Sequence, residues 1–173
     1  LFMANLLGIP LSTSEVTVGA VVGVGVAYQT LFVSNVLVIV SFWVIIPVIA
    51  FAMAWMGGSI IMYLERRDSR WRGAGSGKWK RALTFAVVAM GVFEAFSAGM
   101  NNVANAVGPL VGAGLMTAQA GIFWGGLFVA LGAIALGSRV VETNGKKITN
   151  LTLLQGSFVS GTGGLLVMIA SLF

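Results

Sequence analysis

Apolar residues form long continuous runs along this 173-residue chain, and polar residues gather in a few short clusters between them. A helix needs about 20 apolar residues to cross the hydrocarbon core of a bilayer. Three runs are long enough, and they predict membrane-spanning helices over residues 33–63, 82–108 and 121–138. Pro47 lies inside the first run and predicts a kink there, because proline lacks an amide proton and crowds the preceding turn.

Both ends of the chain are apolar but irregular. Residues 1–28 contain Gly8 and Pro10, which a polar run follows, and residues 148–173 carry many glycine, serine and threonine residues. Irregular backbone at membrane depth is tolerated only where protein or a wet cavity surrounds it. Each end therefore predicts a re-entrant or broken helix. Because the chain starts and stops inside apolar runs, we also expect it to be a piece of a longer protein.

The composition supports an all-α integral membrane protein. Hydrophobic residues make up 58% of the chain and charged residues only 9%, whereas soluble domains average about 25% charged residues. Transmembrane barrels alternate apolar and polar residues, and these runs do not. The absence of cysteine and histidine excludes disulfides, thiolate metal sites and a Ser-His-Asp hydrolase. We expect the protein not to be an enzyme.

The net charge of +5 comes from one segment between Glu65 and Arg81. This segment holds seven basic and two acidic residues, a difference of five, together with Trp71 and Trp79. It could bind nucleic acid, but short loops rich in lysine and arginine are typical of the cytoplasmic side of a membrane, with tryptophan at the interface. The pattern predicts a cytoplasmic loop in a multi-pass protein of the cytoplasmic membrane and no nucleic-acid partner.

The first polar cluster is the run Ser12-Thr13-Ser14-Glu15. Ser12 and Glu15 have the spacing of a capping box, which predicts a helix that starts at Thr13. This cluster could be a well-made helix start and nothing more. A helix start within a membrane also offers unpaired N–H groups and a partial positive charge, and with three hydroxyls beside it the cluster could bind an anion.

The second cluster is a polar stripe on an apolar helix. Glu94, Ser97, Asn101 and Asn105 follow one another at spacings of three and four, with Asn102 beside them. Such groups are costly inside a bilayer and usually face a cavity or a partner. They could join helices by hydrogen bonds. They could also serve transport, because asparagine carbonyl oxygens suit sodium and asparagine amides can donate to an oxyanion.

These clusters resemble the motifs of the inorganic phosphate transporter family. Residues 99–106 read Gly-Met-Asn-Asn-Val-Ala-Asn-Ala, where the family has Gly-Ala-Asn-Asp-Val-Ala-Asn-Ala. Residues 8–15 read Gly-Ile-Pro-Leu-Ser-Thr-Ser-Glu, where it has Gly-x-Pro-Val-Ser-Thr-Thr-His. Residues 42–47 are similar to its Trp-x-x-x-Pro helix, and residues 137–149 to its loop before the second hairpin. The likeness follows nearly the whole chain in order.

The resemblance implies an inverted-repeat transporter with a binding site at the middle of the membrane. Residues 1–64 would end the first repeat with a re-entrant hairpin and a Pro-kinked span. Residues 65–81 would be the cytoplasmic basic loop. Residues 82–173 would begin the second repeat, with two spans and the start of a second re-entrant hairpin. Half of the binding site would then lie outside this chain.

Two departures from the family motifs bear on the substrate. The family's aspartate is Asn102 here, and its histidine is Glu15. Phosphate keeps a proton at neutral pH and benefits from a carboxylate that accepts its hydrogen bond, whereas sulfate prefers a site made only of donors. The change to Asn102 therefore favours sulfate, and the chain resembles a sulfate permease branch of the family. Glu15 brings a new carboxylate, which could complete the capping box or carry a coupling proton.

We therefore expect a symporter for a tetrahedral oxyanion, with sulfate favoured over phosphate. Ser12, Thr13, Ser14 and Asn102 are the expected anion ligands. The expected cation-binding or coupling residues are Asn101, Asn105, Ser97, Glu94 and Glu15, with sodium at Asn101 and Asn105. No cofactor is expected beyond a coupling sodium ion or proton. The expected partners are phosphate or sulfate, the lipid bilayer and, as an open alternative, a second copy in a homodimer. A channel or a membrane scaffold is the rival interpretation.

Overall fold

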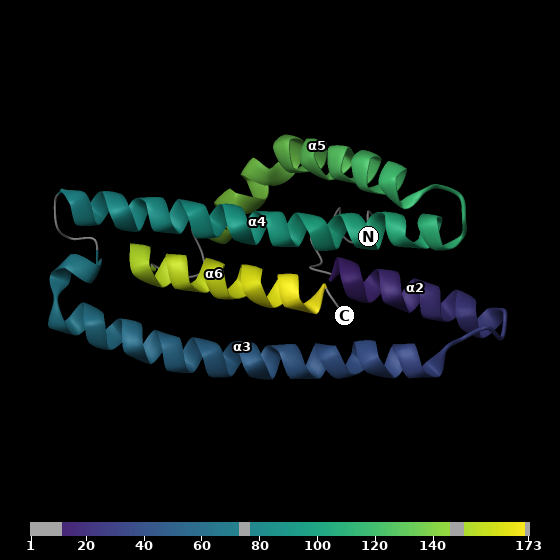
Figure 1. Cartoon of the computed structure of the whole chain (residues 1–173), viewed down its shortest axis with the longest axis horizontal. Helices are drawn as coiled ribbons and strands as arrows, with labels where there is room; N and C mark the ends of the chain where they lie inside the picture. The colour runs from purple at the N-terminus through teal and green to yellow at the C-terminus, as the bar shows by residue number, and fades with distance from the viewer. Residues whose placement is uncertain (1–11, 73–76, 146–150, 172–173) are drawn as a thin grey trace. The chain divides into compact units, whose positions relative to one another are not determined.

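A computed structural model describes residues 12–72, 77–145 and 151–171, leaving out the side chains of residues 72 and 136–145. Within these ranges the chain is helical and contains no strand, which confirms the predicted all-α class. The elements are drawn in Figure 1 and are, in chain order, α2 (Thr13–Ala27), α3 (Val33–Arg67), the short 3-10 helix η1 (Ser69–Arg72), α4 (Lys78–Gly112), α5 (Ala118–Gly145) and α6 (Leu153–Ala170).

The three predicted spans are confirmed as helices α3, α4 and α5. Together with α6, they are the four helices of the described residues that are long and apolar enough to cross a membrane. Helix α3 continues through Pro47 without interruption, and α4 likewise contains Pro109. Helix α2 has only 15 residues, fewer than the roughly 20 that a span requires.

Helix α6 departs from the prediction of a broken segment. The glycine- and serine-rich run between Gly156 and Gly164 lies within one uninterrupted helix of 18 residues, so a break inside this run was a wrong expectation. Glycine lowers helix stability by only about 1 kcal/mol per residue, and tertiary packing overrides this propensity. The role of α6 as the first arm of a re-entrant hairpin stays a prediction.

The helix ends follow local rules that the sequence contains. Helix α4 starts directly after Gly77, which has a φ of 101°, and ends before Gly114, which has a φ of 71°. The Leu115 N–H bonds to the Leu110 carbonyl and the Gly114 N–H to the Val111 carbonyl, which is the hydrogen-bond pattern of a Schellman motif. Helix α2 ends with the same pattern, although Gln29 instead of glycine takes the left-handed position, with a φ of 55°.

The chain divides into two compact units, each made of two stretches of sequence. The first unit comprises residues 1–41 and 99–135. Within it, α5 packs closely on α4, because a Cβ added at Gly125 would lie 2.8 Å from the Val107 Cγ1 atom. Gly121 and Gly125 thus act as a pair of small residues four apart, which allows close helix packing.

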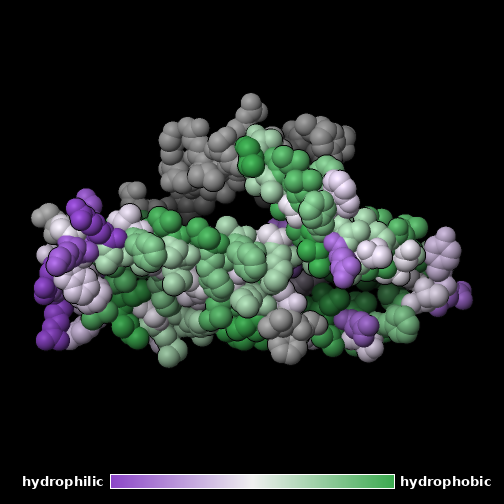
Figure 2. Space-filling view, turned by 45° about the horizontal axis from the view of Figure 1, so that its top comes forward, coloured by the Kyte–Doolittle hydropathy of each residue, from purple (hydrophilic) through white to green (hydrophobic). Residues whose placement is uncertain are grey.

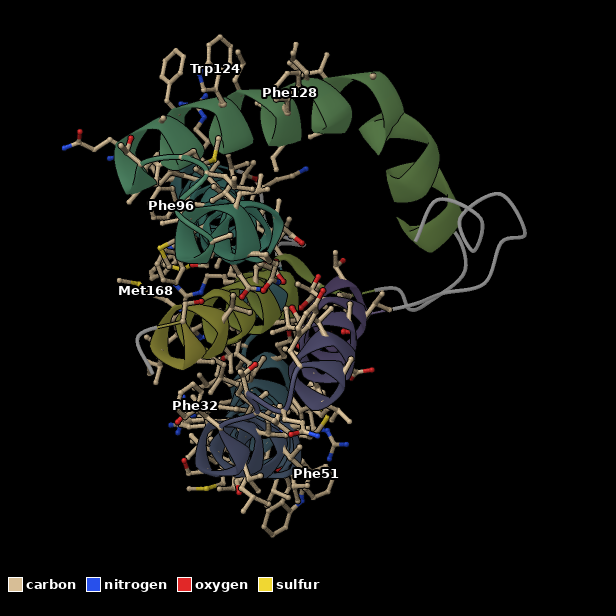
Figure 3. All side chains as sticks on the ribbon, turned by 90° about the vertical axis from the view of Figure 1, so that its right-hand side faces the viewer. Phe32, Phe51, Phe96, Trp124, Phe128 and Met168 are labelled. Carbon is tan, nitrogen blue, oxygen red and sulfur yellow. The ribbon has the colours of Figure 1, made fainter. Side chains whose placement is uncertain are left out.

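The opposite face of α5 carries large aromatic side chains. Trp124 stacks with Phe128, their ring centroids lying 6.4 Å apart, and Figure 3 shows both rings on the face of α5 that is turned away from α4. The Phe128 side chain is 65% exposed in the isolated chain. Such a face is suited to lipid.

The second unit comprises residues 42–98 and 136–173. Its helix α6 lies between α3 and α4 (Figure 1) and contacts both through glycine positions. A Cβ added at Gly164 would lie 2.7 Å from the Phe93 ring of α4, and the Phe158 ring of α6 lies directly over Gly57 of α3. The α6 backbone is therefore held tightly on both sides.

Apolar side chains cover the outside of the helices, and few are buried inside. In the described residues the buried apolar residues are Ile61, Leu83 and Leu166. In contrast, Phe51 of α3 is 72% exposed and Ile134 of α5 is 80% exposed. Figure 2 shows hydrophobic residues over much of the visible surface. Exposed apolar surface of this extent marks a lipid-facing or partner-facing protein, as expected for an integral membrane protein.

The basic segment lies where α3 gives way to α4. Arg70 binds Asp68 through its backbone N–H (2.9 Å) and its Nε atom (2.7 Å). These hydrogen bonds and the charge of Arg70 hold the pKa of Asp68 below its usual value. Nearby, the Trp71 and Trp79 rings meet edge to face with their centroids 5.3 Å apart. In its described residues the segment carries exposed arginine and lysine side chains.

Candidate oxyanion and cation site

The candidate site begins at the start of α2. Ser12 has extended backbone angles and accepts a hydrogen bond from the Glu15 N–H at 3.4 Å, so it is the N-cap that the sequence predicted. The Ser12 carbonyl accepts from the Val16 N–H. The first backbone N–H groups of α2, at Thr13 and Ser14, have no partner within their own helix. The preceding motif residues Gly8 and Pro10 lie outside the described residues.

Ser14 connects this helix start to the asparagine stripe of α4. The Asn105 Nδ2 atom donates to the Ser14 hydroxyl oxygen at 2.7 Å, and the Asn101 Nδ2 atom approaches the same oxygen at 3.4 Å. The two asparagines are four residues apart and share one face of α4. The structure thus brings together the two polar clusters, which lie 87 and 91 residues apart in the sequence. All of these residues belong to the first unit.

This geometry divides the donors and acceptors of the cluster. A serine hydroxyl has two acceptor positions and one proton, so Ser14 keeps its proton for donation when both asparagine amides bond to its oxygen. Each asparagine that donates through Nδ2 keeps its carbonyl oxygen as an acceptor. The cluster can therefore present a hydroxyl and helix N–H groups to an anion and two carbonyl oxygens to a hard cation such as sodium.

A largely apolar groove of about 1010 Å³ adjoins this cluster. Its walls are α2, the turn at residues 30–32, the start of α3 and the end of α4. Asn105 lines the groove and also bonds to Ser14, so the groove reaches the polar cluster at Asn105. The remaining polar lining is sparse and includes Thr17, whose hydroxyl donates to the Thr13 carbonyl at 2.9 Å.

The other predicted residues of this unit lie around the cluster. Thr13 and Glu15 are exposed, whereas Ser14 between them is partly buried against α4. Glu15 is next along the helix from Ser14 and so projects about 100° away from it. Asn102 is partly buried and is likewise one residue away from Asn101. Because consecutive residues of a helix project about 100° apart, Asn102 lies on a neighbouring face of α4.

Glu94 and Ser97 belong to the second unit. Ser97 is fully buried, and its hydroxyl donates to the Phe93 carbonyl one turn earlier at 3.0 Å. Glu94 is partly buried and faces α6, since its Oε1 atom lies 3.1 Å from the position that a Cβ at Gly163 would take. An acidic group between membrane-spanning helices is a functional candidate by default. Its coupling role stays a prediction.

A buried acidic residue of the second unit was not predicted as such from the sequence. Glu65 was assigned to the basic loop, yet it lies in the last turn of α3 and is only 5% exposed. It accepts hydrogen bonds from the Thr152 hydroxyl and from the Gln155 Nε2 atom, the latter at 2.7 Å. The threonine–glutamine spacing of a capping box at residues 152–155 was visible in the sequence. Its contact with Glu65 was not.

The sequence of this chain is similar to those of known membrane transport proteins. A family model described as the phosphate transporter family matches residues 1–173. The sulfate permease CysP of Bacillus subtilis is 57% identical over the whole chain, which covers 47% of that relative. The sodium-dependent phosphate transporter 2 of Homo sapiens is 34% identical over 98 residues, half of this chain and 15% of that protein. The chain thus spans about half the length of the first of these relatives and a smaller share of the second. No solved structure matches it.

Proposed function

Because this chain belongs to the phosphate transporter family, we propose that the full protein is a secondary transporter of a tetrahedral inorganic oxyanion. The observation that carries this proposal is the hydrogen-bonded cluster of Ser14, Asn101 and Asn105. It joins the start of an apolar helix too short to span the membrane to a polar stripe on a membrane-spanning helix. Irregular elements that end at membrane depth are typical of transporter binding sites.

The anion would bind at the start of α2. Thr13 and Ser14 supply hydroxyl and backbone donors, and Ser12 orients the first turn as its N-cap. The helix dipole adds a partial positive charge at the same end. Hydrogen-bond donors of this kind can stabilise the negative charge of an oxyanion without a basic side chain. The start of a helix is a well-established anion site. Asn102 would contribute a further amide from α4.

Sulfate is the substrate that we favour. Asn102 stands where the family's aspartate is expected, and an amide can donate to sulfate where a carboxylate would repel it. The whole-length similarity to a protein named as a sulfate permease supports this choice. Phosphate is the second candidate, because the matching family is named for it and a shorter match is to a phosphate transporter.

The coupling ion would be sodium or a proton. The carbonyl oxygens of Asn101 and Asn105 suit sodium, whereas the carboxylates of Glu15 and Glu94 could carry a proton. Transport would proceed by alternating access, in which rigid elements rock around a fixed site. A channel is disfavoured because the polar residues concentrate at a few points, and a channel needs a polar path along its length.

Uptake by the full-length protein in proteoliposomes tests this proposal. Labelled sulfate and labelled phosphate are each supplied with an inward sodium gradient, an inward proton gradient or neither. We expect saturable sulfate uptake that one of the two gradients drives, with phosphate as a weaker substrate. Uptake of phosphate alone would overturn the sulfate assignment. If neither anion accumulates under any gradient while the protein is folded, the transporter proposal is wrong.

A further inference from the structure

A polar cluster in the second unit joins a buried carboxylate to the start of α6. The Glu65 carboxylate at the end of α3 accepts from Thr152 through one oxygen and from Gln155 through the other. Only 5% of the surface of Glu65 is exposed to solvent. The adjacent Arg66 and Arg67 are exposed. A carboxylate among basic residues would usually remain at the surface, so its burial calls for a specific role.

The two partners of Glu65 are the two halves of the capping box of α6. The Thr152 hydroxyl oxygen accepts from the Gln155 N–H at 3.2 Å, and the Gln155 Oε1 atom accepts from the Thr152 N–H at 3.3 Å. This leaves one hydroxyl proton and one amide group as donors, and both point to the same carboxylate. A carboxylate only accepts hydrogen bonds, so it matches two donors better than any other side chain. Its negative charge also lies at the positive end of α6.

The position of α6 matters because its glycines pack closely on α4, so a shift of the helix would be costly. A Cβ at Gly164 would lie 3.0 Å from the Glu94 Cα atom, and one at Gly161 would lie 3.1 Å from the Met90 sulfur atom. One residue of displacement is a 1.5 Å rise and a 100° rotation. A displacement that brings Thr162 to the place of Gly161 would also bring Leu165 to the place of Gly164, a larger side chain at both positions. Close contact with Glu94 therefore favours one register of α6.

We propose that Glu65 is a positioning residue that sets this register and thereby holds the α6 backbone against the Glu94 carboxylate. The role in transport rests on the proposed function, in which Glu94 is a coupling candidate. In this proposal Glu65 acts through Thr152 and Gln155 and not on the transported ions. It acts at the first turn of α6, and the effect reaches Glu94 two to three turns further along because α6 is one continuous helix.

The register can be measured by disulfide cross-linking, because these 173 residues contain no cysteine that would compete; any cysteine elsewhere in the full-length protein is first replaced by serine. In the full-length protein, a Met90→Cys/Gly161→Cys pair should form a disulfide on mild oxidation, and a Met90→Cys/Thr162→Cys pair should form much less. Adding Glu65→Ala removes the two hydrogen bonds to the Glu65 carboxylate and should raise the cross-link at position 162 relative to 161 by at least about tenfold, the factor that corresponds to the loss of one hydrogen bond to a charged group. Arg66→Ala, an exposed neighbour, should leave the ratio unchanged.

A second pair of variants protects the test against misfolding. Thr152→Ser keeps the hydroxyl donor and should preserve the cross-link at position 161, whereas Thr152→Val removes the donor and should shift it as Glu65→Ala does. An unchanged ratio in both Glu65→Ala and Thr152→Val would overturn the proposal. If Glu65→Ala does not fold, an unchanged cross-link ratio in Thr152→Val alone would also overturn the proposal.

The transport readout is separate from the cross-link. Glu65→Ala should lower the maximal rate of uptake and weaken its dependence on the driving gradient, and Arg66→Ala should alter neither. A register shift without any change in gradient dependence would overturn the functional half of the proposal. The cross-link can be measured in a protein that transports nothing. A failure of the oxyanion-transport proposal can therefore be distinguished from a failure of the register proposal.

Discussion

Replacement of Ser14 by alanine removes the atom that joins the two polar clusters. The Ser14 oxygen accepts from Asn105 at 2.7 Å and from Asn101 at 3.4 Å, so Ser14→Ala leaves two partly buried amides without this acceptor. The loss of one such partner costs about 1 kcal/mol at a partly buried position. This is small beside a typical unfolding free energy of about 5–15 kcal/mol, and the variant should fold.

The larger effect of Ser14→Ala falls on the ligand. Losing one hydrogen bond to a charged group costs about 1.5–3 kcal/mol, which raises the half-saturation concentration for the anion roughly 10- to 150-fold. The assay is the initial rate of sulfate uptake by the full-length protein in proteoliposomes, over a range of sulfate concentrations. Ser41→Ala is the matched control, because the Ser41 hydroxyl bonds to the Leu37 carbonyl of its own helix, at 2.7 Å. Equal half-saturation in Ser14→Ala and Ser41→Ala, at equal expression, would refute the assignment of Ser14 to the site.

Three further predictions concern substrate, orientation and packing. Asn102→Asp should move preference from sulfate toward phosphate in uptake competition, because a close like charge costs up to ~4 kcal/mol at 4 Å with an effective dielectric of about 20; an unchanged ratio would count against Asn102 as a ligand. A cysteine at the exposed Ser69 should resist impermeant thiol reagents in intact cells and react in opened vesicles, and labelling of intact cells would reverse the topology. Gly125→Ala should lower the free energy of unfolding by about 1–3 kcal/mol, measured by thermal melting in detergent, because its Cβ would lie 2.8 Å from Val107. Gly126→Ala, with open space around it, should not lower it, and equal melting of the two variants would argue against this helix packing.

The sequence was sufficient to predict the helices because local signals decide where they lie. The predicted span at 82–108 lies within α4, whose ends are set by Gly77 and Gly114. Ser12 was recognisable as the N-cap of α2 by its spacing from Glu15. The expected break in α6 was wrong because glycine propensity was weighed without the packing of α6 between two other helices, which the sequence does not show.

The contacts within the candidate site could be predicted only in part. Residue types and spacing identified Ser14, Asn101 and Asn105 as polar groups in an apolar setting, but not which of them meet, because pairs 87 and 91 residues apart depend on how the helices pack. The same reason hid Glu65. Its charge suggested a solvated loop, and its burial follows only from donors at residues 152 and 155, 87 and 90 residues away.

The central claim is that the start of α2 binds an oxyanion, and protection of an introduced cysteine tests it most directly. Thr17 lies one turn after Thr13, and its hydroxyl bonds to that residue's carbonyl at 2.9 Å. In the full-length Thr17→Cys variant, the rate of reaction with a thiol reagent is measured in membrane vesicles at constant ionic strength, with sulfate or with chloride. We predict that sulfate slows the reaction with a saturable concentration dependence and that chloride does not. Equal rates in the two salts, in a variant that still takes up sulfate, would contradict the account.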